Sequence, residues 1–112
     1  MGKGGKILRG FVALCENMKI TECLWLDSFV DKIIRKHGVF PEEIEEAFSG
    51  NAFVRRLEGG HVKGEDLYVA LGRSAAGRYL SVLFVRKRGG RALIISARDM
   101  TKRERKDYGK RT

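Results

Sequence analysis

Three arginines stand at the ends of apolar, strand-like runs in the second half of the chain. Arg73 closes the run that starts at Leu67, Arg78 opens the next run, and Arg98 closes the last one. A guanidinium group keeps its positive charge and offers paired donors that fit phosphate oxygens. No Gly-rich phosphate loop, dinucleotide fingerprint or paired Cys or His zinc motif accompanies these arginines. We therefore expect arginine to bind a phosphodiester, with no metal ion and no cofactor.

RNA is a phosphodiester that can be cleaved without a metal ion, because its 2′-hydroxyl is an internal nucleophile. Cleavage requires deprotonation of that hydroxyl, neutralisation of the phosphorane oxygens and protonation of the leaving 5′-oxygen. Arginine suits the second task, and histidine can exchange protons near neutral pH. The chain has two histidines, His37 and His61. His37 equally fits a capping residue at a helix end, and His61, in the Gly-rich loop 59–64, equally fits a solvated loop residue.

Other residues are candidates for contacts with RNA. The basic run of Arg86, Lys87 and Arg88 forms the tip of an expected hairpin, where it either contacts phosphates or stays in solvent. Tyr108 can stack on a base or pack the last helix against the sheet. Together with His61, these residues complete the expected RNA-binding set. The arginines at strand ends have a structural alternative too, since charged side chains deter pairing at sheet edges.

The composition indicates one small folded domain with a strongly basic second half. The chain has 112 residues, 43% of them hydrophobic and 33% charged, and its net charge is +9. Residues 57–112 hold 14 basic and 6 acidic side chains, against 9 and 8 in residues 1–56. Such asymmetry indicates a localised positive surface and an acidic partner: nucleic acid, an acidic protein or anionic lipid.

The number of cysteines and the length of the apolar runs indicate in which cellular compartment the protein is expected. Cys15 and Cys23 are too few and too close together for a disulfide framework. No apolar run approaches the roughly 20 residues of a membrane span. We therefore expect a cytoplasmic protein that makes no contact with a membrane.

The first half of the chain predicts one strand and two helices. Residues 19–26 are β-branched and aromatic with partial alternation, which predicts a strand. Asp27 or Ser28 can cap a helix whose apolar face continues to His37. A second helix follows, with proline and four glutamates in its first turns, and glycines follow both helices, which suits their C-terminal ends.

The second half predicts a strand-rich segment and a final helix. Hairpin-sized connectors containing glycine make the last three strands antiparallel neighbours. Thr101 and Glu104 have the spacing of a capping box at the start of a short basic helix. The expected strands are residues 52–57, 67–73, 78–86 and 91–98.

These elements predict an α+β fold. Two N-terminal helices pack on an antiparallel meander sheet of about four strands, and a short C-terminal helix follows. Residues 1–17 are Gly-rich, basic and weakly patterned, so we expect a flexible extension there and a single domain over residues 18–112.

Two groups of residues resemble motifs of the BrnT toxin family, and together they cover the chain from about Met18 to Arg111. The first group comprises Trp25, Asp27, the run Arg35-Lys36-His37-Gly38-Val39, and Pro41-Glu42-Glu43. The second comprises Gly72-Arg73, Gly77-Arg78, the run Ile95-Ser96-Ala97-Arg98-Asp99-Met100-Thr101, Glu104-Arg105 and Tyr108.

The resemblance implies a type II toxin: a small ribonuclease with a RelE-like fold that inhibits translation by cleaving RNA. It implies a cognate antitoxin protein as partner, in a dimer or a toxin–antitoxin heterotetramer. It also implies that Arg73, Arg78 and Arg98 bind the scissile phosphate, and that His37 or Lys36 acts as acid or base.

An alternative function uses the same basic surface without catalysis. In that case the protein is a module that binds RNA or an acidic protein partner. A DNA-binding regulator fits less well, because no helix pair includes an exposed basic recognition helix.

Overall fold

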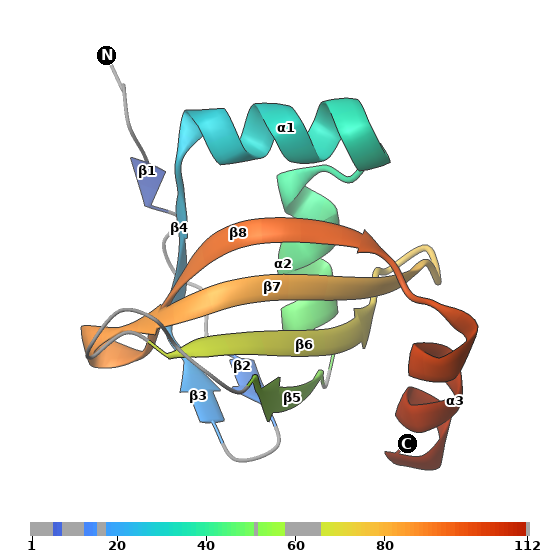
Figure 1. Cartoon of the computed structure of the whole chain (residues 1–112). Coiled ribbons are helices and arrows are strands. Elements are labelled where there is room, and N and C mark those ends of the chain that lie inside the picture. The colour runs from blue at the N-terminus through green and yellow to red at the C-terminus, as the bar shows by residue number, and fades with distance from the viewer. Residues whose placement is uncertain (1–5, 8–12, 16–17, 51, 58–65, 112) are drawn as a thin grey trace.

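The fold is built around one β-sheet, seen in Figure 1. The computed structural model describes residues 6–7, 13–15, 18–50, 52–57 and 66–111. Within these residues the strands of the main sheet follow the order β1-β4-β8-β7-β6-β5. Their bounds are β1 Lys6–Ile7, β4 Glu22–Trp25, β5 Phe53–Arg56, β6 Leu67–Arg73, β7 Tyr79–Lys87 and β8 Arg91–Asp99. A separate small sheet pairs β2, Ala13–Cys15, with β3, Met18–Ile20.

The sheet is mixed, so the prediction of an antiparallel meander of about four strands was wrong in part. The strands β5 to β8 pair antiparallel in chain order, as expected. However, β4 pairs with β8 in parallel, which brings the strand count to five, with the two-residue β1 beyond it. The chain leaves β4 through two helices, returns at the far edge, and runs back until β8 lies beside β4. Local patterns predict strands but not this order, because the β4–β8 pairing joins distant segments.

Two helices, α1 (Asp27–His37) and α2 (Pro41–Ser49), fill the connection between β4 and β5. The cap of α1 differs from the prediction: Leu26 is the N-cap, without a side-chain hydrogen bond, and Asp27 is already helical. Asp27 therefore acts as a negative charge in the first turn, where the helix dipole favours it. Gly38 ends α1 with a left-handed φ of 62° and donates its N–H to the Ile34 carbonyl at 2.9 Å, as glycine commonly does there.

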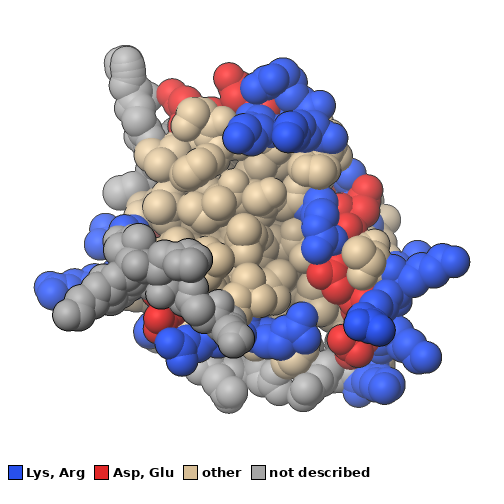
Figure 2. Space-filling model, viewed as in Figure 1, with Lys and Arg blue, Asp and Glu red and all other residues tan. Residues whose placement is uncertain are grey.

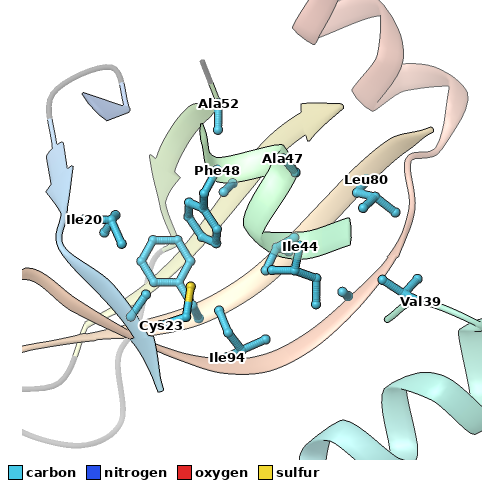
Figure 3. Close-up of a cluster of buried hydrophobic side chains, with 14 of the residues drawn as sticks. Ile20, Cys23, Val39, Ile44, Ala47, Phe48, Ala52, Leu80 and Ile94 are labelled. Atoms are coloured by element: carbon cyan, nitrogen blue, oxygen red, sulfur yellow. The ribbon is translucent and has the colours of Figure 1, made fainter. Parts of the chain in front are cut away.

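The main core lies between α2 and one face of the sheet, as the close-up in Figure 3 shows. On β7 the alternate residues Leu80, Val82 and Phe84 point to this side and are fully buried. Phe48 of α2 meets Phe84 edge-on, with ring centroids 5.4 Å apart. The packing is close, because a Cβ placed on Gly72 would lie 2.6 Å from the carbonyl oxygen of Ala47.

The third helix, α3 (Lys102–Arg111), belongs to the other face of the sheet. Its predicted capping box is confirmed: Thr101 N–H donates to Glu104 Oε1 at 2.9 Å, and Glu104 N–H donates to Thr101 Oγ1 at 3.1 Å. Tyr108 of α3 packs with Val69, Leu71 and Met100 in a second cluster. Among the described residues, α3 packs on one end of this face, as Figure 1 shows, and we call it the open face.

Two segments of residues 1–17 are described as strands, β1 and β2. The rest of residues 1–17 lies outside the described part, so the division into a flexible extension and a domain over 18–112 stays a prediction. No helix of the described residues is long and apolar enough to cross a membrane.

Candidate functional site

A basic groove lies where α3 meets the end of β6 and the start of β7. It has a volume of about 520 Å³ and is lined by Arg73, Tyr79, Lys102, Arg105, Lys106, Tyr108 and Gly109. Four of these residues are cationic and two are tyrosines, and none of the described lining residues is acidic. Figure 2 shows Lys and Arg side chains gathered at the α3 end of the molecule. We call this feature the α3 groove.

Tyr79 organises the arginines of the α3 groove. The guanidinium carbon of Arg73 lies 4.6 Å from the centroid of the Tyr79 ring, and that of Arg105 lies 4.2 Å from it. Stacking on an aromatic ring orients a guanidinium and leaves donors at its edge available. Tyr79 in turn meets Tyr108 edge-on, with centroids 6.1 Å apart. The rings therefore hold two cations in a fixed place, which suits the binding of an anion.

Arg98 also lies on the open face, but its guanidinium is already paired with a carboxylate. Its guanidinium donates to Glu104 Oε1 at 2.8 Å and to Oε2 at 3.0 Å. These hydrogen bonds, opposed by burial, hold the pKa of Glu104 below its ordinary value. Ser81 Oγ also donates to Glu104, at 3.4 Å. An anion that binds Arg98 must therefore compete with Glu104.

Arg78 lies on the opposite face, where its guanidinium joins three elements. It donates to both carboxylate oxygens of Asp99, at 2.7 and 3.3 Å, and to Glu43 at 3.2 Å. It also donates to the carbonyl oxygens of His37 and Gly38, at 3.0 and 2.9 Å. The hydrogen bond from Arg78 is the main cause of a pKa of Asp99 below its ordinary value. Arg78 thus fastens the end of α1 to α2 and β8.

His37 and Lys36 lie in the last turn of α1, and both are exposed. The backbone of His37 belongs to the Arg78 cluster through its carbonyl oxygen. Because Arg78 lies on the helix-covered face and Arg73 on the open face, the structure does not gather the five predicted catalytic residues in one place. It divides them among the α3 groove, the Arg98–Glu104 pair and the end of α1.

The basic hairpin tip lies at the other end of the sheet. Arg86 and Lys87 end β7, and Arg88 begins a short 3₁₀ turn. Since β7 runs from Tyr79 to Lys87, about 26 Å of extended strand separates this tip from the α3 groove. His61 lies outside the described residues. Tyr108 is only 6% exposed, so most of its ring packs α3 against the sheet and is not available to stack on a base.

Four charged or aromatic residues of the α3 groove were not predicted as site residues: Tyr79, Lys102, Arg105 and Lys106. A signal was present for three of them, because positions 102, 105 and 106 share one face of a helix. Tyr79 had no such signal. Its position depends on the register of the hairpin, in which Arg73 pairs with Tyr79.

The described residues contain no group of three or more His, Cys, Asp or Glu side chains that could hold a metal ion. A protein-family model described as "Ribonuclease toxin, BrnT, of type II toxin-antitoxin system" matches residues 27–104, well over half of the chain. No curated protein matches the sequence.

Proposed function

Because the chain belongs to the BrnT family of type II toxin–antitoxin ribonuclease toxins, we propose that it cleaves RNA in the cytoplasm without a metal ion and so inhibits translation. Its fold would then be a variant of the RelE-like toxin fold. The observation that carries this proposal is the α3 groove, where two guanidinium groups stack on Tyr79 and the described lining holds no carboxylate.

The α3 groove would bind the scissile phosphate through Arg73 and Arg105. Both side chains are exposed, and both are oriented by the same ring. Their charge would neutralise the phosphorane oxygens, which carry extra negative charge in the transition state. Lys102 and Lys106, one helical turn apart, would hold neighbouring phosphates of the same strand.

Arg98 and Arg78 would contribute differently from Arg73. Arg98 would join the phosphate only if the anion displaces Glu104, so its contribution to cleavage would be smaller. Arg78 would keep the end of α1 in place rather than contact RNA, because its donors already meet two carboxylates and two carbonyls. This assignment revises the prediction that all three arginines bind one phosphate.

Two sets of residues could transfer the protons. One set is in the α3 groove and consists of the Tyr79 phenol with Lys102 and Lys106. The other is the predicted pair His37 and Lys36 at the end of α1. The groove set is favoured because it lies on the same face as Arg73 and Arg105.

Conservative variants separate the two sets. Tyr79→Phe keeps the ring that orients the arginines and removes only the hydroxyl, so it should lower the cleavage rate by about 100-fold if that hydroxyl exchanges a proton. His37→Ala should leave the rate unchanged. A rate that falls only in His37→Ala would assign proton transfer to the end of α1.

The function itself is tested by incubating the purified protein with total RNA in the presence of EDTA. Cleavage that continues at full rate is expected, together with arrest of protein synthesis when the chain is expressed in cells. If RNA is bound by the α3 groove but never cut, the protein is the non-catalytic binding module. Cleavage that stops with EDTA would contradict metal independence.

A further inference from the structure

The open face carries a strip of aliphatic side chains that begins beside the α3 cluster and continues along the sheet away from α3. In the ladder, Val69 pairs with Leu83, Leu67 pairs with Val85, and Val85 pairs with Leu93. Directly paired residues point to the same face of a sheet. Their neighbours Ala70, Val82 and Phe84 point to the main core, so these five side chains point away from it. We call Leu67, Val69, Leu83, Val85 and Leu93 the open-face strip.

The open-face strip is not sealed as the main core is. Leu83, Val85 and Leu93 are partly exposed, whereas Val82 and Phe84 on the other face are 0% exposed. In Figure 2 the described surface over β7 and β8 includes an area without charged side chains. A contiguous apolar area of this kind on a small protein commonly marks an interface.

A hollow marks the place where the strip meets the α3 end. It has a volume of about 190 Å³, and Leu83 and Val69 line it together with Ser81, Ser96, Arg55, Arg98, Leu57 and Glu104. The lining of this hollow combines apolar side chains with hydroxyl and charged groups. That combination suits an apolar side chain of a partner, inserted with polar groups around it.

Cations border the strip at both ends. Arg55 is the cross-strand partner of Val69, and Arg98 lies at the α3 end. Lys87 and Arg91 pair at the other end, on the same face as Val85 and Leu93. Glu104, which lines the hollow, is already paired with Arg98. A complementary partner is therefore acidic as well as apolar.

RNA does not fit this strip, because aliphatic side chains offer neither hydrogen bonds to phosphate nor rings on which bases stack. A type II toxin has a second partner, its antitoxin. We propose that an acidic, amphipathic segment of the antitoxin docks on the open-face strip. Its apolar side chains would lie on Leu83 and Val85, and its carboxylates would face Arg55 at one edge and Arg91 at one end. The inference rests on the family of the chain, and not on which residues cut RNA.

The experiment measures the affinity of the purified full-length chain for the antitoxin, taken as the purified protein encoded beside the toxin gene. Leu83→Glu places a negative charge in the middle of the strip and should weaken binding about 100-fold or more, as expected for the centre of an interface. Phe40→Glu is the matched control. Phe40 is 48% exposed at the start of α2, away from the open face, so this variant should bind as tightly as the wild type.

A second variant keeps the test valid if Leu83→Glu fails to fold. Ser96 is polar, partly exposed and paired with Leu83, so Ser96→Glu adds the same charge without removing an apolar side chain. It should also weaken binding, and Arg55→Glu should do so most strongly at low salt. Both variants should cleave RNA at the wild-type rate, which separates this proposal from the proposed function.

Three outcomes would overturn the inference. Wild-type affinity of folded Leu83→Glu and Ser96→Glu would place the antitoxin elsewhere. Dissociation of a toxin dimer by these variants, with unchanged antitoxin affinity, would identify a second copy of the chain as the occupant. Loss of RNA binding with unchanged antitoxin affinity would assign the strip to RNA.

Discussion

Arg73 and Arg78 stand five residues apart at the two ends of one turn, yet their surroundings differ completely. Arg78 donates to two carboxylates and two carbonyls on the face covered by α1 and α2. Arg73 stacks on Tyr79 on the open face and lines the α3 groove. The face on which an arginine at a strand end lies therefore decides its role. On the covered face it stabilises the fold through hydrogen bonds and ion pairs, and on the open face it is a candidate ligand for an anion.

The largest expected effect is the loss of RNA cleavage on substitution of Arg73, on the open face. Arg73→Ala should lower the rate of RNA cleavage by about 100- to 1000-fold, because a charge aimed at the transition state is lost. Its melting temperature should change little, since Arg73 is exposed. Rates are measured on a fluorogenic RNA oligonucleotide in EDTA. Arg103→Ala is the matched control, an exposed arginine of α3 that does not line the groove. Equal losses in the two variants would show a general charge effect.

The next largest effect is the loss of stability on substitution of Arg78, on the face covered by α1 and α2. Arg78→Ala should lower the free energy of unfolding by about 2 kcal/mol, because it leaves partly buried acceptors without a donor. Urea unfolding followed by circular dichroism measures this change. The cleavage rate per folded molecule should stay near the wild-type value. A stable Arg78→Ala protein that no longer cleaves would reverse the assignment of the two arginines.

A smaller effect is expected on the stability of the fold at acidic pH. Asp99 and Glu104 have pKa values lowered by hydrogen bonds from Arg78 and Arg98, relative to ordinary values of 3.8 and 4.5. A lowered pKa contributes stability that is present above the ordinary value and is lost as the pH falls through the lowered one. The free energy of unfolding should therefore drop below about pH 4.5, and Glu104→Gln should flatten that drop. An unchanged pH profile in Glu104→Gln would show that its ion pair contributes nothing.

The smallest effect on RNA cleavage is expected for the basic hairpin tip, at the far end of the sheet. Arg88→Ala should change the cleavage rate less than about threefold and reduce the salt dependence of RNA binding by about one phosphate contact at most. The affinity is measured by fluorescence anisotropy between low and physiological salt. A loss as large as that of Arg73→Ala would move the site to the hairpin tip.

Much of this architecture follows from local signals. The C-terminal ends of α1 and α2, the two antiparallel hairpins and the Thr101–Glu104 capping box are determined by nearby residues, so the sequence predicts them. The parallel pairing of β4 with β8 could not be predicted, because it depends on the path of the whole chain around the helices.

The candidate site shows the same limit at the scale of one residue. Arg73 and Arg78 lie at the two ends of one hairpin turn, and the register pairs Arg73 with Tyr79. Because neighbouring residues of a strand point to opposite faces, Arg78 faces away from Arg73 and Tyr79. Turn length alone does not determine the register, so the sequence could not decide which arginine faces the groove.

The most direct test of the α3 groove is an NMR titration of this 12.6 kDa protein with an RNA oligonucleotide made uncleavable by 2′-deoxy substitution. The bound strand should shift the backbone amides of Arg73, Tyr79, Lys102 and Arg105 and leave those of His37, Arg78 and Asp99 in place. Shifts concentrated at His37, Arg78 and Asp99, with the amides of α3 unchanged, would contradict the account.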